Sequence, residues 1–228
     1  EYVERLGIRK EIYLRGAGAL ATSIVAEPDY EIVSFSGVQK AELSGFTIKP
    51  SRDEFSLLPA IQCTESSPVI RNNRIEFSKG AAGIECFRNS NPLIEENALE
   101  NCGIRTFSSQ PVIRNNSIQP FEGCGVECFE SSFATIRGNT IYSTQIGGMP
   151  AISIFQSSAS IKDNMLYCNF DGSGIRIDKA THVDISNCII ADKGNESVGL
   201  LIRNSSEICI INNTIHTRIR GVFEQNSA

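Results

Sequence analysis

One short sequence pattern recurs along this chain of 228 residues, and each copy has an asparagine two positions before its last apolar residue. Examples are PVIRNNRI (68–75), PVIRNNSI (111–118) and ATIRGNTI (134–141). The asparagines of successive copies are Asn73, Asn97, Asn116, Asn139, Asn164, Asn187 and Asn213. A motif that recurs at a period of about 24 residues is the signature of a solenoid, in which each repeat stacks on the one before it.

A second motif lies about halfway between these asparagines, as in GIEC (83–86), GVEC (125–128) and GIRI (174–177). Both motifs alternate apolar and other residues, which is the period of a β-strand. Gly, Asn, Ser and Pro separate the alternating segments, as turns require. No long segment carries apolar residues at helical spacing, so the pattern predicts an all-β chain with almost no helix.

Short strands at this period, without helices between them, predict a coil of parallel strands with about eight or nine rungs and three faces. The Asn in the same turn of every rung is expected to hydrogen-bond to its neighbours, and Asn tolerates a left-handed backbone. AELSGFTI (41–48) fits the same frame with Phe46 in the Asn position. Because the repeat runs nearly from end to end, we expect one domain over 1–228, and a fragment of a longer protein.

These repeats resemble the right-handed parallel β-helix of the pectin-lyase-like superfamily over about residues 5–226. More narrowly, they are similar to the repeats of bacterial periplasmic repeat proteins, mannuronan epimerases and F-box ubiquitin-ligase receptors. The opening segment, residues 2–25, resembles the first turn of pectinesterases. The resemblance implies the fold strongly. It implies either a partner-binding scaffold or a protein that acts on polysaccharides.

Composition narrows the choice of partners and compartment. The net charge of −5 argues against a general nucleic-acid surface, and no apolar run is long enough to span a membrane.

Three of the eight cysteines, Cys63, Cys86 and Cys128, take the last inward position of the second motif, where Cys replaces a small apolar residue. No CxxC occurs. We therefore expect reduced, mostly buried thiols and an intracellular, cytoplasmic protein.

The sequence argues against catalysis. The enzymes that the chain resembles attack polyuronates with paired carboxylates, Asp-bound calcium or a basic residue, and the pectinesterase, polygalacturonase and mannuronan epimerase motifs are missing. The acidic residues Asp163, Asp171, Asp178 and Asp184 are too far apart in sequence for a calcium loop. We expect no catalytic residues, no metal site and no cofactor.

Four phenylalanines follow the second motif in successive rungs: Phe87, Phe107, Phe129 and Phe155. If the alternation continues, these rings face solvent and form an apolar patch that fits a partner or a sugar. If the strand bends there, the rings turn inward as an aromatic stack. The polar residues around this Phe row are Glu85, Arg88, Arg105, Glu127 and Glu130. Glu85, Arg105 and Glu127 form either a ladder of surface ion pairs or a binding strip of mixed charge.

A third row lies just before the turn that carries the repeated Asn, which we call the Asn corner, and it is mostly basic. Its members are Arg71, Glu95, Arg114, Arg137 and Lys162. Such a row fits the carboxylates of an acidic glycan or peptide, although basic residues also protect solvated strand edges from aggregation.

Two loops exceed the minimum length of the repeat, 49–59 and 192–197, and insertions on solenoids often lie at the binding face. The sequence thus favours a non-catalytic scaffold that binds a protein partner along the Phe row. The alternative is a module that binds or degrades acidic polysaccharides, with Arg71, Arg114, Arg137 and Lys162 as its glycan-binding residues. A purely structural stalk is a third reading.

Overall fold

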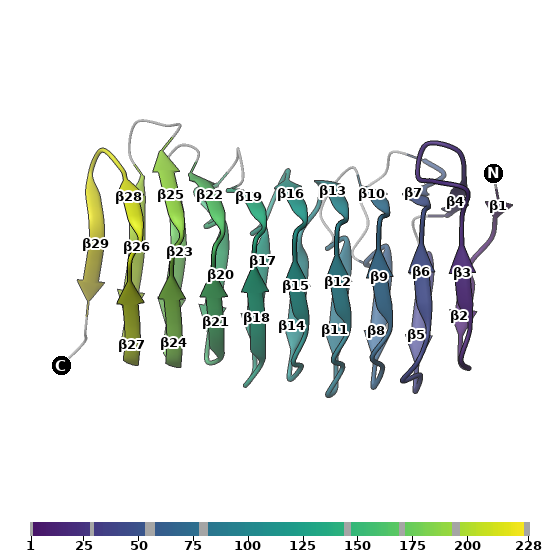
Figure 1. Cartoon of the computed structure of the whole chain (residues 1–228), viewed down its shortest axis with the longest axis horizontal. Helices are drawn as coiled ribbons and strands as arrows, with labels where there is room; N and C mark the ends of the chain where they lie inside the picture. Colours follow the sequence, from purple (N-terminus) through teal and green to yellow (C-terminus); the bar gives the residue numbers. More distant parts are fainter. Residues whose placement is uncertain are drawn as a thin grey trace.

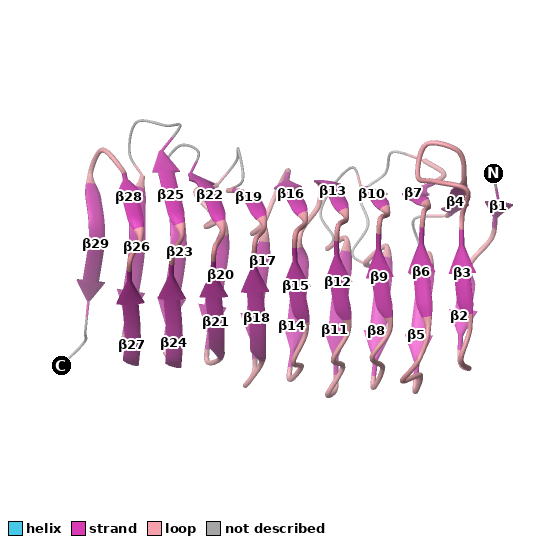
Figure 2. Ribbon diagram, in the orientation of Figure 1, coloured by secondary structure: helices cyan, strands magenta, loops and turns pink. Residues whose placement is uncertain are grey.

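The computed structural model describes residues 2–27, 30–52, 58–77, 82–143, 147–168, 172–192 and 197–225. Parts of both predicted loops, 53–57 and 193–196, lie outside these described residues, as does Asp171. Throughout the described ranges the backbone forms strands joined by turns, and no helix is present (Figures 1 and 2). The two termini lie at opposite ends of an elongated rod (Figure 1).

Each turn of the coil contributes one strand to each of three parallel sheets, which we name A, B and C. Sheet A contains β1 (Tyr2–Val3), β4 (Ser23–Ala26), β7 (Thr47–Pro50), β10 (Arg74–Glu76), β13 (Ala98–Asn101), β16 (Ser117–Pro120), β19 (Thr140–Tyr142), β22 (Met165–Cys168), β25 (Ile189–Asp192) and β28 (Thr214–His216).

Sheet B contains the second motif. Its strands are β2 (Leu6–Ile8), β5 (Val33–Ser36), β8 (Ile61–Thr64), β11 (Ile84–Phe87), β14 (Ile104–Phe107), β17 (Val126–Phe129), β20 (Ile152–Phe155), β23 (Ser173–Asp178), β26 (Val198–Arg203) and β29 (Arg220–Gln225).

Sheet C precedes the Asn corner. Its strands are β3 (Tyr13–Arg15), β6 (Glu42–Ser44), β9 (Val69–Arg71), β12 (Leu93–Glu95), β15 (Val112–Arg114), β18 (Phe133–Arg137), β21 (Ser158–Lys162), β24 (Thr181–Ser186) and β27 (Ser206–Ile211). The predicted all-β solenoid with three faces is therefore confirmed.

Columns of branched apolar side chains fill the interior of the coil. In sheet B the pairing joins Ile84 to Ile104 and Ile104 to Val126, and all three side chains are fully buried. Every inward position stacks on its equivalent in the next rung, about 4.8 Å away. A continuous core of this kind requires the same residue size at the same position of each rung, which is why the sequence repeats.

The cysteines behave as core residues. Seven of the eight are buried and unpaired, as predicted, and Cys209 is exposed. In strand register Cys63 lies beside Cys86, and Cys128 lies beside Thr106 in the same inward column. Burial raises the pKa of Cys128 to about 12, which disfavours its reactive thiolate form.

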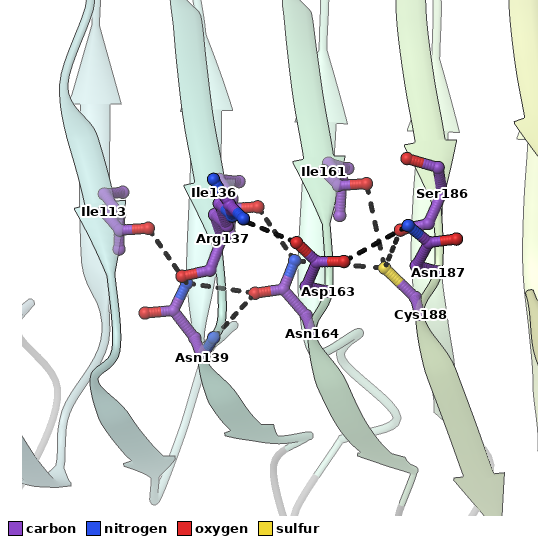
Figure 3. A network of polar contacts seen from close by, with 10 residues as sticks. All are labelled: Ile113, Ile136, Arg137, Asn139, Ile161, Asp163, Asn164, Ser186, Asn187 and Cys188. Atoms are coloured by element: carbon purple, nitrogen blue, oxygen red, sulfur yellow. Dashed lines mark hydrogen bonds and ion pairs between the residues drawn. The ribbon is translucent and has the colours of Figure 1, made fainter.

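The Asn ladder forms at the corner between sheets C and A (Figure 3). Asn139 donates from Nδ2 to the carbonyl of Ile113 and to Oδ1 of Asn164, and its backbone N–H donates to the same Oδ1. The same contacts link Asn73 to Asn97 and Asn97 to Asn116. The ladder therefore satisfies buried backbone groups at a turn that sheet pairing alone leaves open.

The ladder departs from the prediction at one rung. Asn187 has a positive φ of 55° and is exposed, and the buried ladder position is taken by Cys188. The left-handed residue at this corner is the one before the ladder Asn, as in Asn72, Asn115 and Asn212. Several repeats have two consecutive asparagines, so the sequence does not show which of the two is the buried one. The assignment of Asn187 to the ladder was therefore wrong by one residue. Phe46 lies in the ladder position, as predicted, and its N–H donates to Asn73 Oδ1.

The corner between sheets B and C differs by one residue between neighbouring rungs. In the rung of β17 and β18 it spans 130–132, between Phe129 and Phe133. In the next rung it spans only 156–157, because Ser158 is the register partner of Phe133. Strand β18 also begins at Phe133 whereas β15 begins at Val112, opposite Thr135.

Candidate functional site

The outward row of sheet B carries a compact ion-pair cluster. Strand pairing places Glu85 beside Arg105 and Arg105 beside Glu127, as predicted from the alternation. Arg105 Nε donates to Glu127 Oε2 at 2.8 Å, and Arg105 Nη1 lies 3.7 Å from Glu85 Oε1. Both glutamates are buried although they point away from the core.

This cluster holds two carboxylates around one guanidinium. Burial raises the pKa of Glu85, Arg105 opposes the rise, and Glu127 adds to it. The arginine bridges the two acids through one hydrogen bond to Glu127 and a longer ionic contact with Glu85. The geometry is that of a ladder of ion pairs along the outer face of sheet B, and a binding role of these residues stays a prediction.

The Phe row lies on the outside of sheet B. The rings of Phe87 and Phe107 stack with centroids 4.7 Å apart, those of Phe107 and Phe129 at 5.2 Å, and Phe155 meets Phe129 edge-on at 6.4 Å. All four side chains are half-buried and lie outside the hydrophobic core. Stacking covers both faces of the Phe107 ring and one face each of the Phe87 and Phe129 rings.

Arg88 and Glu130 flank the Phe row at the corner between sheets B and C. Both are exposed and have left-handed backbone conformations, with φ of 53° and 52°. They lie directly after Phe87 and Phe129 in the chain. The predicted partner-binding residues are therefore brought together along one edge of sheet B, and their role stays a prediction.

The basic row runs along the outward face of sheet C, at the ends of its strands. Register places Arg71 beside Glu95, Glu95 beside Arg114, Arg114 beside Arg137, and Arg137 beside Lys162. The basic row is thus a line of side chains on five successive strands, spaced about 4.8 Å apart.

Acidic side chains hold the arginines of this row in place. Arg114 contacts Glu95 at 2.6 Å, Arg137 contacts Asp163 at 3.0 Å (Figure 3), and Arg71 contacts Glu42 at 3.2 Å. The carboxylates of Glu42 and Glu95 are nearly buried, whereas the arginines are more exposed. The guanidinium groups of this row therefore lie closer to solvent than the carboxylates that they contact.

Glu42 is the most enclosed of these acids. Burial acts to raise its pKa, but hydrogen bonds from Ser44, Arg15 and Arg71 outweigh that effect, and the pKa is lowered. Glu42 therefore stays ionised and anchors Arg71 at one end of the row. At the other end, Lys162 is exposed and makes no ion pair with any described residue.

No group of three or more His, Cys, Asp or Glu residues is arranged to hold a metal ion in the part of the chain that the structure describes. His182 is exposed and pairs with Glu207 across β24 and β27. Over the same ranges, no helix is long and apolar enough to cross a membrane.

Comparison with known proteins agrees with this architecture. A family model described as a right-handed beta helix region matches residues 33–152, which is more than half of the chain. The chain belongs to this family. No curated protein sequence matches the chain.

Solved structures with this β-helix fold include two epimerases. A double mutant of the periplasmic alginate epimerase AlgG superposes with a TM-score of 0.66 at 14% identity, covering 99% of this chain and 66% of that one. The A-module of mannuronan C-5 epimerase AlgE6 from Azotobacter vinelandii superposes with a TM-score of 0.51 at 10% identity, covering 99% and 89%. The chain thus spans slightly less than two thirds of the AlgG structure.

The predicted intracellular, cytoplasmic location is wrong, because the similar structures include a periplasmic protein. The prediction relied on unpaired cysteines. In this β-helix seven of them are enclosed in the core, where they replace other small apolar residues. Unpaired buried thiols therefore report packing rather than compartment.

Proposed function

We propose that this β-helix is a non-catalytic binding module for acidic polysaccharides, and that the basic row on sheet C is its binding surface. The observation that carries the proposal is the alignment of Arg114, Arg137 and Lys162 on three consecutive strands, all exposed. Three cations at a regular spacing suit a polymer that carries one carboxylate on each sugar residue.

The chemistry of these side chains fits carboxylate recognition. A guanidinium presents a rigid fork of donors that matches a carboxylate, and an ammonium adds a mobile point charge. The side chain of Arg137 is 67% exposed although it contacts Asp163, so several of its donors remain available. Lys162 extends the row by one strand.

The similar structures support the same ligand class. Both are named as epimerases of alginate or mannuronan, which are polyuronates, although at 10–14% identity they share only the fold with this chain. The sequence lacks the Asp-Pro-His-Asp motif that the resemblance to mannuronan epimerases would lead one to expect. Binding without turnover is therefore the reading that we propose.

The Phe row remains a second candidate surface, for a protein partner. Its four rings form a continuous half-buried stripe, which is a feature of protein interaction sites. We place it second because stacking already covers both faces of Phe107 and one face each of Phe87 and Phe129.

The double variant Arg137→Gln/Lys162→Gln is expected to bind polygalacturonate about tenfold more weakly than the wild type, because two charge-assisted contacts are lost. Arg114 is left unchanged because its guanidinium holds the buried Glu95. Titration calorimetry at low salt measures the change, and a thermal melt verifies the fold.

The matched control is Lys40→Gln, which removes an exposed charge at a corner several rungs away. Polygalacturonate with methyl-esterified carboxylates serves as the control ligand. Equal binding of the double variant and the wild type, or equal binding of the charged and esterified polymers, would contradict the proposal.

A further inference from the structure

A polar groove lies at the corner between sheets B and C, between the Phe row and the basic row. It has a volume of about 470 Å³ and is lined by corner residues and the first residues of three strands of sheet C. The lining residues are Glu130, Ser131, Ser132, Phe133, Gln156, Ser157, Ser158, Lys179 and Thr181. Sequence reasoning did not identify this groove.

The groove lies where the corner differs by one residue between two rungs. The corner before β18 spans 130–132, whereas the corner before β21 spans only 156–157. The stack of the Phe row breaks between the same two rungs, where Phe155 is inclined by 60° to Phe129. Lys179 Nζ lies 5.7 Å from the centre of the Phe155 ring and borders the groove.

Phe133 gives the groove an apolar wall. It is 47% exposed, on the outward side of sheet C. Its partner in register on β21 is Ser158, whose small side chain leaves the ring uncovered on that side. On the other side β15 begins at Val112, beyond the position opposite Phe133.

The polar groups around Phe133 are available to a ligand. Among the described residues, no side-chain hydrogen bond or ion pair engages the Glu130 carboxylate, the Ser131 hydroxyl or the Gln156 amide. Glu130, Gln156 and Lys179 are exposed. An aromatic ring surrounded by a carboxylate, an amide and an ammonium has the chemistry of a sugar site, since a pyranose has an apolar face and a hydroxylated rim.

We propose that this groove is a saccharide subsite that holds one uronate residue, with the apolar face of the sugar on Phe133. Lys179 pairs with the sugar carboxylate, while Gln156 and Glu130 hydrogen-bond to its hydroxyls. The inference deepens the proposed function and rests on it for the ligand class. It adds a ring-stacking contact that the basic row does not have.

The groove and the basic row are joined by two strands. β18 runs from Phe133 at the groove to Arg137 in the row, and β21 runs from Ser158 to Lys162. Four residues of extended chain span about 13 Å, with Thr135 and Ser160 facing outward between the two ends. A short oligosaccharide that runs along these strands contacts both the groove and the row.

The variant Phe133→Ala is expected to abolish saturation transfer from aromatic protons of the protein to the sugar protons of trigalacturonate in NMR. Its affinity for trigalacturonate is expected to fall about fivefold to tenfold. Val112→Ala is the matched control, because it removes an exposed apolar side chain from the adjacent strand of the same face and should change neither signal. Lys179→Gln should weaken binding of trigalacturonate but not of its methyl ester.

The outcomes separate this inference from the proposed function. If Phe133→Ala binds trigalacturonate like the wild type while Arg137→Gln/Lys162→Gln loses the polymer, the subsite is refuted and the basic row stands. If Phe133→Ala loses binding while the row variant retains the polymer, the subsite stands and the role of the row falls. Absence of binding by the wild type would overturn both.

Discussion

Replacing Gly103 with alanine is expected to lower the free energy of unfolding by about 3 kcal/mol, an overpacking effect at the upper end of the usual range. Gly103 precedes β14 and holds the first position of the second motif. A Cβ built there would collide with the backbone carbonyl of Cys124 and would lie 2.7 Å from the carbonyl oxygen of Gly125. Both atoms belong to the next rung, so the collision cannot be relieved by a side-chain rotation.

This close approach explains why the second motif so often starts with glycine. The spacing of successive rungs is fixed by strand pairing, so extra volume at this point must displace backbone. The control is Gly7→Ala in β2, where the nearest atom, Ser34 Oγ, is 3.9 Å away. Urea denaturation of both variants measures the effect. If Gly103→Ala is as stable as Gly7→Ala, the tight rung contact described here is incorrect.

Replacing Asn116 with alanine is expected to lower the free energy of unfolding by roughly 1–3 kcal/mol, because buried polar groups lose their partners. Asn116 Oδ1 accepts the backbone N–H and the Nδ2–H of Asn97, and its own Nδ2 donates to the carbonyls of Ile94 and Arg114. Ser117→Ala, which alters the exposed next residue, is the control. An unchanged denaturation midpoint for Asn116→Ala would refute a stabilising ladder.

The interrupted rung offers the reverse test. Cys188 replaces the ladder Asn. In the direction of this rung, the only acceptor for Asn164 Nδ2 among the described residues is the sulfur of Cys188, at 3.9 Å. Cys188→Asn restores an oxygen acceptor between Asn164 and Asn213, so it is expected to raise the free energy of unfolding by about 0.5–1.5 kcal/mol. A loss of stability would show that the ladder position is set by size and not by hydrogen bonding.

The sequence was sufficient to predict the features that repeat. The alternation in GIEC and GVEC placed Cys86 and Cys128 inside and Glu85 and Glu127 outside, because a strand has a fixed period of two. The same rule placed the Phe row and the basic row on successive strands. It left open whether the phenylalanines faced inward, since the residue that follows a motif can begin a turn.

Features that depend on differences between rungs were not predictable in this way. The groove lies where a corner of three residues, 130–132, is followed by one of two residues, 156–157, and this difference becomes visible only when rungs are aligned in register. Asp163, which contacts Arg137, lies at the left-handed corner position, where the alternation gives no direction. The location of the protein was mispredicted because a cysteine buried in the core is unpaired whatever the compartment, so it does not indicate a reducing one.

The central claim is that this β-helix binds acidic polysaccharides and does not degrade them. The most direct test is to incubate the purified chain with pectate, alginate and other uronate polymers, with and without calcium, and to measure both retention on the polymer and product formation. We predict retention of the chain on at least one uronate polymer without product. Product that disappears when a carboxylate is substituted, or no retention on any polymer, would contradict the claim.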